Sequence, residues 1–129
     1  MIIDASALIA ILREEPDAGG LRNAIAIAER RRISAATYVE TSIVIDSQRD
    51  PVASRRLDDF LTRTQTEIVP FTETQAKLAR EAYRAFGKGS GHPARLNFGD
   101  CMAYALAKDL GEPLLFKGDD FTKAGIDAA

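Results

Sequence analysis

Acidic residues stand at several points where the sequence predicts a strand to end or a helix to begin. They are Asp4, which follows the apolar pair Ile2-Ile3, then Glu40, Asp100, and the adjacent Asp119 and Asp120. Carboxylate oxygens are the ligands that hard divalent cations such as Mg²⁺ and Mn²⁺ prefer. Such an ion lowers the pKa of a water molecule and stabilises a departing oxygen, which suits hydrolysis of a phosphate ester. These residue types predict metal-assisted hydrolysis, provided that the fold gathers them.

Helical and strand-like patterns alternate along the whole chain, and they decide where the acids lie. Short apolar segments predict strands at 2–3, 33–35, 67–70 and 113–116, with a small edge strand near 126. Helices are predicted over 6–14, 17–30, 52–64 and 97–110, and from residues 37 and 72 onwards. This alternation indicates an α/β fold, a short parallel sheet of four to five strands flanked by helices, in a single domain over 1–129. The carboxyl ends of parallel strands share one edge, so the acids are expected to meet there.

Helix capping is a simpler explanation for each acid taken alone. Thr37 and Glu40 match the capping-box pattern, which predicts a helix beginning at Thr37 with Val39, Ile43 and Val44 facing inward, and Asp100 stands three residues after Asn97. Asp4 could cap the first helix, although Ser6 is an alternative cap that would leave Asp4 free. Acids near a helix N-terminus gain about 0.3–1 kcal/mol. Taken together, however, converging carboxylates repel one another unless a cation lies between them.

Composition excludes several classes of site. The chain of 129 residues has one cysteine, Cys101, and one histidine, His92, so a cysteine-rich zinc site and a histidine pair are excluded. The net charge of -2 does not suit a globally basic nucleic-acid binder. No apolar run approaches the roughly 20 residues that span a bilayer, and no signal peptide is visible, so we expect a cytoplasmic protein without a membrane segment.

The acids and their flanking residues resemble the PIN-domain nucleases, most closely the VapC toxins of bacterial toxin–antitoxin pairs. The resemblance rests on Ile2-Ile3-Asp4-Ala5-Ser6, on Glu40, on Gly99-Asp100 and on Leu114-Leu115-Phe116-Lys117-Gly118-Asp119-Asp120-Phe121. It implies a PIN-like three-layer fold and a ribonuclease that depends on Mg²⁺ or Mn²⁺. It also implies carboxylate ligands matching Asp4, Glu40 and Asp100, plus an acid in the terminal turn. Among these, we expect Asp4 and Asp100 to hold the principal ion and Glu40 to ligate or orient the attacking water. The resemblance further implies neutralisation by a VapB-type antitoxin and a homodimer.

One position departs from the family pattern. Many members carry their fourth acid two positions before the Asp-Phe pair, where this chain has Gly118. The fourth role therefore falls to Asp119, to Asp120 or to both, and we choose Asp119 because Asp120 could instead hold the turn. Ser6 is a further candidate, as a hydrogen-bond partner of an active-site carboxylate or as a helix cap.

Basic residues near the acids are candidates for contacts with RNA. Lys88, His92 and Arg95 lie in a glycine-rich loop ahead of Asp100, and Lys117 precedes the terminal acids. The loop could clamp an RNA backbone or could be an ordinary solvated loop, and Lys117 could meet a phosphate or balance its acidic neighbours.

Two other functions compete with the nuclease. A receiver-like signalling domain also has an acidic Mg²⁺ pocket, but it would need paired acids after the first strand, where Asp4 stands alone. A non-catalytic interaction module would use the acids only as caps. The nuclease hypothesis explains the whole set of acids.

Overall fold

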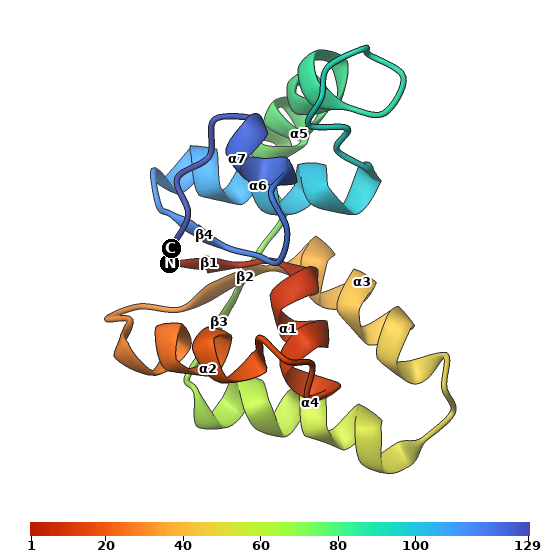
Figure 1. The fold of residues 1–129 in the computed structure, drawn as a ribbon, viewed down its shortest axis with the longest axis vertical. Helices are drawn as coiled ribbons and strands as arrows, with labels where there is room; N and C mark the ends of the chain where they lie inside the picture. The colour runs from red at the N-terminus through yellow and green to blue at the C-terminus, as the bar shows by residue number, and fades with distance from the viewer.

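The computed structural model describes all residues from Met1 to Ala129, and a parallel four-stranded sheet in the order β3-β2-β1-β4 lies at its centre (Figure 1). The strands are β1 (Ile2–Ile3), β2 (Arg32–Ser34), β3 (Glu67–Val69) and β4 (Leu114–Leu115). β1 is central, because Ile2 pairs with Arg32 on one side and with Leu114 on the other. The tail adds only an isolated bridge between Leu114 and Ala128, where an edge strand is expected from the sequence.

Helices cover both faces of the sheet, which is the middle one of three layers (Figure 1). They are α1 (Ala5–Leu12), α2 (Ala18–Ile27), α3 (Ala35–Asp46), α4 (Pro51–Arg63), α5 (Glu73–Phe86), α6 (Phe98–Leu110) and α7 (Asp120–Lys123). Successive strand residues point to opposite faces, so Ile2 packs in one apolar cluster with α5, α6 and α7, and Ile3 packs in another with α1, α2 and α4. The predicted three-layer α/β fold with a short parallel sheet is confirmed.

Helix α3 begins earlier than the sequence predicts. Its N-cap is Ser34, whose hydroxyl accepts a hydrogen bond from the backbone N–H of Ala36, so the capping box predicted for Thr37 and Glu40 is wrong. The predicted inward face is wrong as well, because Val39 and Ile43 are 53% and 64% exposed. The buried residues of α3 are Thr37, Thr41 and Ile45, a stripe at i, i+4 and i+8 that apolar periodicity alone does not reveal.

The first turns of two other helices agree better with the sequence. Asn97 and Asp100 form a complete capping box at the start of α6, as their spacing predicts. Gly111 ends that helix with a left-handed φ of 63°, which glycine adopts without strain. Asp4, rather than Ser6, caps α1, because its side chain accepts a hydrogen bond from the backbone N–H of Ser6.

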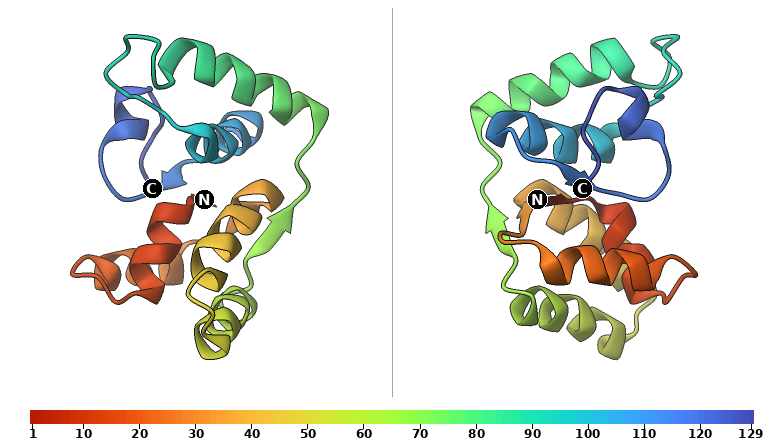
Figure 2. Two further views of the ribbon diagram at one scale, coloured as in Figure 1. Left: turned by 90° about the vertical axis from the view of Figure 1, so that its right-hand side faces the viewer. Right: turned by 60° about the vertical axis from the view of Figure 1, so that its left-hand side comes forward.

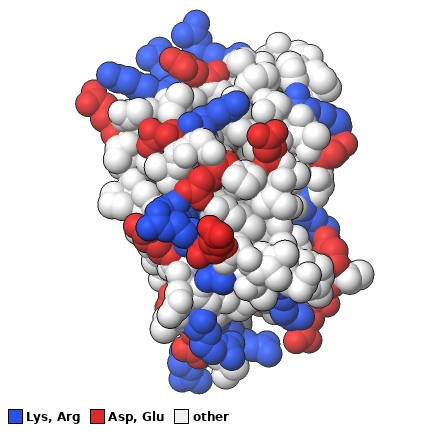
Figure 3. Space-filling model, turned by 90° about the vertical axis from the view of Figure 1, so that its left-hand side faces the viewer, with Lys and Arg blue, Asp and Glu red and all other residues white.

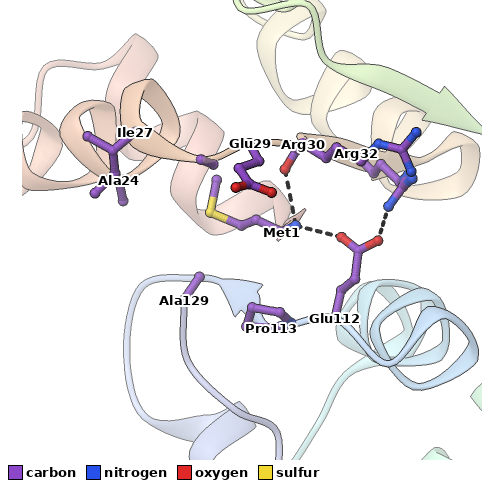
Figure 4. A pocket seen from close by; sticks show the side chains of 10 residues that line it. Met1, Ala24, Ile27, Glu29, Arg30, Arg32, Glu112, Pro113 and Ala129 are labelled. Carbon is purple, nitrogen blue, oxygen red and sulfur yellow. Dashed lines mark hydrogen bonds and ion pairs between the residues drawn. The ribbon is translucent and has the colours of Figure 1, made fainter.

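The amino ends of the strands form an edge where acidic and basic side chains are interspersed (Figure 3). A hollow at this edge is lined by Met1, Arg32, Glu112 and their neighbours (Figure 4). Glu112 binds the Met1 ammonium group at 2.5 Å and also pairs with Arg32. Arg32 also pairs with Glu67 at 3.2 Å, so that two carboxylates balance the two cations. The hollow lies at the opposite end of β1 from Asp4. None of the helices combines the length and apolar character needed to cross a bilayer.

Candidate functional site

Asp4 lies at the carboxyl end of β1, where the chain turns directly into α1. Figure 2 (left) looks at this edge of the molecule, with α1 and α3 on one side of the sheet and α6 on the other. The Asp4 side chain is 2% exposed. Its Oδ2 accepts hydrogen bonds from the Ser6 backbone N–H at 3.0 Å and from the Ser6 hydroxyl at 2.6 Å, whereas its buried Oδ1 has no partner. Burial, with a further contribution from the charge of Asp100, raises the pKa of Asp4 to about 6 despite these bonds.

Glu40 lies in the second turn of α3, and its side chain is free of the capping role that the sequence suggests. Burial, with smaller contributions from the charges of Asp4 and Asp100, raises the pKa of Glu40 to about 7. The electrostatic effect identifies all three carboxylates as near neighbours, although they come from different elements. The carboxylate of Glu40 also lies against Gly99, a residue of the Gly99-Asp100 pair to which the sequence assigns no role of its own.

Asp100 occupies the first turn of α6, with one of its carboxylate oxygens engaged. Its Oδ2 accepts a hydrogen bond from the Asn97 backbone N–H at 2.9 Å. Burial raises the pKa of Asp100, the bond to Asn97 lowers it, and the charges of Asp120 and Lys88 have opposite, smaller effects. Asp100 therefore serves both as a cap and as a member of the acidic group.

The two acids of the terminal turn have different surroundings. Gly118 has a φ of 95° and leads the chain from β4 into α7. Asp119 forms an ion pair with Lys123 at 3.0 Å and is 73% exposed. Asp120, the first residue of α7, is instead the acid whose charge acts on Asp100. Both acids are exposed, but Asp120 is the one whose charge reaches Asp100, whereas Asp119 is paired with Lys123.

The remaining candidates also lie in defined surroundings. The Ser6 hydroxyl donates to Asp4 and accepts from the Lys117 backbone N–H at 3.0 Å, so it joins α1 to the turn after β4. The Lys117 side chain pairs with Glu15 and Asp17 at 2.9 and 3.5 Å. That ion-pair network directs its ammonium group to the segment after α1.

The basic loop after α5 divides into two kinds of residue. The His92 Nδ1 accepts a hydrogen bond from the Ala94 backbone N–H at 3.0 Å, and the ring packs edge-on against Phe86. His92 therefore holds the loop in shape. Lys88 and Arg95 are exposed, and the charge of Lys88 acts on Asp100.

Comparison with known proteins identifies the family. The profile of the PIN domain matches residues 1–127. Ribonuclease VapC28 of Mycobacterium tuberculosis is 58% identical over 129 residues, which is 100% of this chain and 97% of that protein. The chain belongs to the VapC family of PIN-domain ribonucleases. Ribonuclease VapC of Mycolicibacterium smegmatis is 49% identical over 99% of this chain and 98% of its own length.

Solved structures show the same fold at much lower sequence identity. VapC20 of Mycobacterium tuberculosis, described as a toxin that cleaves the sarcin-ricin loop, superposes with a TM-score of 0.76 at 18% identity, covering 99% of this chain and 97% of that one. FitAcB from Neisseria gonorrhoeae gives a TM-score of 0.71 at 18% identity, covering 98% and 94%. The PIN fold is thus supported by sequence and by structure, and the VapC family is shown by the sequence relatives.

The acids of this VapC-family chain suit a divalent cation in their donor chemistry. Asp4 Oδ1 is a buried carboxylate oxygen without a partner, and a buried charge of this kind requires compensation. The charge of Asp100 raises the pKa values of Asp4 and Glu40, and the charge of Asp4 raises that of Glu40, effects that a cation among these acids would reverse. No three His, Cys, Asp or Glu side chains already stand in metal-binding geometry. The fit to an ion rests instead on the carboxylate donor atoms and on the electrostatics of the site.

Proposed function

We propose that this VapC-family chain is a cytoplasmic toxin that acts as an endoribonuclease, hydrolysing RNA phosphodiester bonds with Mg²⁺ or Mn²⁺. The observation that carries the proposal is the convergence of Asp4, Glu40 and Asp100 from three separate elements: the Glu40 carboxylate lies against Gly99, next to Asp100, and the charges of Asp4 and Asp100 act on it. Relatives of nearly full length that are named ribonucleases support it. The PIN-family match removes the grounds for a receiver-like domain, and the buried acids argue against a merely structural module.

The roles of the acids follow from their surroundings. Asp4, with its free Oδ1, and Asp100 would hold the ion, which when bound supplies positive charge to the phosphate and acidifies the attacking water. Glu40, a half-buried carboxylate beside the other two acids, orients that water and accepts its proton. Asp120 completes the acidic group in preference to Asp119. Ser6 fixes the direction of the Asp4 carboxylate.

The RNA backbone would be held mainly by the loop after α5. Lys88 and Arg95 are exposed there, and the charge of Lys88 already acts on Asp100. His92 supports the loop from within rather than contacting RNA, and Lys117 is engaged by Glu15 and Asp17. We therefore assign RNA contacts to Lys88 and Arg95, which are free to pair with phosphates.

Protein partners would cover the exposed apolar surface. Large apolar side chains are exposed on α3, where Val39 and Ile43 are 53% and 64% exposed, and also on α5 and at the start of α6, where Tyr83 and Phe98 are 48% and 78% exposed and line one hollow. We propose that a second copy of the chain covers part of this surface in a homodimer and that a VapB-type antitoxin neutralises the toxin. Light scattering on the purified chain tests the dimer, and a monomeric mass would contradict it.

Cleavage of RNA by the purified protein tests the nuclease proposal. The wild type should cleave with Mg²⁺ or Mn²⁺ and stop when a chelator is added, and Asp4→Asn should reduce the rate by at least about 10²-fold while the chain remains folded. Asp59→Asn, which changes an exposed acid on α4, is the matched control and should cleave normally. Undiminished cleavage by Asp4→Asn would overturn the assignment.

A further inference from the structure

Gly99, the second residue of α6, is buried directly against the carboxylate of Glu40. A Cβ atom placed on Gly99 would overlap the Glu40 Oε2 and Cδ atoms and would lie 2.7 Å from Oε1. No other atoms are among its three nearest contacts. The space that a side chain at position 99 would need is therefore filled by the functional end of Glu40.

The backbone at this position does not itself require glycine. Gly99 has a helical conformation, whereas the glycines with a left-handed φ are Gly89, Gly91, Gly111, Gly118 and Gly125. Glycine within a helix is less favourable than alanine, because it loses more conformational freedom on folding. Two other helical glycines, Gly19 and Gly20 of α2, have open space where a Cβ would stand. The close approach of Glu40 is thus the specific feature that sets Gly99 apart.

We propose that Gly99 is a positioning residue of the nuclease centre, because its missing side chain lets the Glu40 carboxylate lie against the first turn of α6 beside Asp100. This inference rests on the proposed function, in which Glu40 handles the attacking water. Glu40 comes from α3 and Asp100 from α6, so the contact at Gly99 sets how closely the two helices present their acids. Any larger residue at position 99 displaces Glu40 from this place.

The consequence separates activity from stability. The atoms that a Cβ would meet belong to the far end of a flexible side chain, so Glu40 can rotate away without disturbing the core. Alanine also favours the helix more than glycine does. Gly99→Ala should therefore leave the unfolding temperature unchanged or higher, and it should still misplace the carboxylate.

Steady-state cleavage of one defined RNA by Gly99→Ala tests the inference, with Gly20→Ala as the matched control. We expect kcat to fall by about 10²-fold with little change in KM, since a displacement of about 1 Å can cost that much. Gly20→Ala should keep the wild-type kcat, since nothing lies within 4 Å of its added Cβ. Wild-type kcat in Gly99→Ala, or a fall in its unfolding temperature that accounts for the lost activity, would overturn the inference.

A double variant shows whether Gly99 acts through Glu40. Glu40→Gln should lower kcat, and adding Gly99→Ala to it should cause no further loss, because the group being positioned no longer functions. If the double variant lost as much additional kcat as Gly99→Ala loses by itself, Gly99 would act on RNA or on Asp100. That result would overturn this inference and leave the proposed function standing. Full activity of Glu40→Gln would instead overturn the role that the proposed function gives to Glu40.

Discussion

At the scale of single residues, the two oxygens of the Asp4 carboxylate have different surroundings. Oδ2 accepts two hydrogen bonds from Ser6 and caps α1, and Oδ1 is buried without a partner. Capping and metal binding are alternatives when Asp4 is considered from sequence alone. The structure assigns capping to one oxygen and leaves the other available, so the two roles are compatible in one side chain.

The terminal acids give a prediction that separates two neighbours. Asp120→Asn should reduce RNA cleavage by roughly 10-fold or more, because this carboxylate acts on Asp100. Asp119→Asn removes only an exposed ion pair with Lys123, and such pairs contribute about 0–1 kcal/mol, so cleavage should stay near the wild-type rate. Cleavage rates of the two variants, measured side by side, check this. The reverse order would restore Asp119 as the fourth acid.

At the scale of elements, α3 shows why one part of the site could not be predicted. A capping-box pattern is short, and Ser34 competes with Thr37 for the role of N-cap in the same stretch of sequence. The competition is decided by where β2 ends, which depends on pairing of Ser34 with Val69 across the sheet. Sequence patterns could predict that Glu40 is important, but the release of its side chain from the helix terminus depends on this tertiary contact.

Two substitutions at the start of α3 test that account. Ser34→Ala should lower the free energy of unfolding by about 1 kcal/mol, because the cap of α3 is lost. Thr37→Val should leave it unchanged or higher, because the buried Thr37 hydroxyl has no partner and valine has the same shape. Urea unfolding of both variants provides the measurement. A large loss with Thr37→Val and none with Ser34→Ala would favour the Thr37 cap.

At the scale of the whole molecule, the parallel sheet brings distant parts of the sequence to one edge. The alternation of strands and helices predicts a parallel sheet flanked by helices, and the resemblance to PIN-domain nucleases adds the three layers. Both lead us to expect Asp4, Glu40 and Asp100 at one edge of the sheet. Finer features were not predictable. The opposite surroundings of Asp119 and Asp120, the pairing of Lys117 with Glu15, and the contact between Gly99 and Glu40 all depend on side-chain positions that only the packed structure fixes.

The buried acids predict how the stability of the metal-free protein depends on pH. The pKa of Asp4 is raised from 3.8 to about 6 and that of Glu40 from 4.5 to about 7, so between about pH 4 and pH 7 the folded chain binds more protons than the unfolded chain. The free energy of unfolding should therefore fall as pH rises through this range, with Asp4 alone contributing up to about 3 kcal/mol. Urea unfolding at about pH 5 and about pH 8 measures the difference.

The same comparison includes its own control. The side chain at position 4 of Asp4→Asn cannot lose a proton, so the stability of this variant should depend less on pH than that of the wild type. At about pH 8 the variant should be more stable than the wild type. A divalent ion should stabilise the wild type at that pH by binding the folded state alone. Stability of the metal-free wild type that increases with pH across this range would contradict the electrostatic account of the site.

Direct titration of Mn²⁺ into the purified chain by calorimetry is the sharpest test of the claim that these acids form a metal-dependent nuclease centre. The wild type and the control Asp59→Asn should bind the ion alike, and Asp4→Asn should bind it at least about 10²-fold more weakly. No detectable binding to the wild type, or equal binding to Asp4→Asn, would contradict the claim.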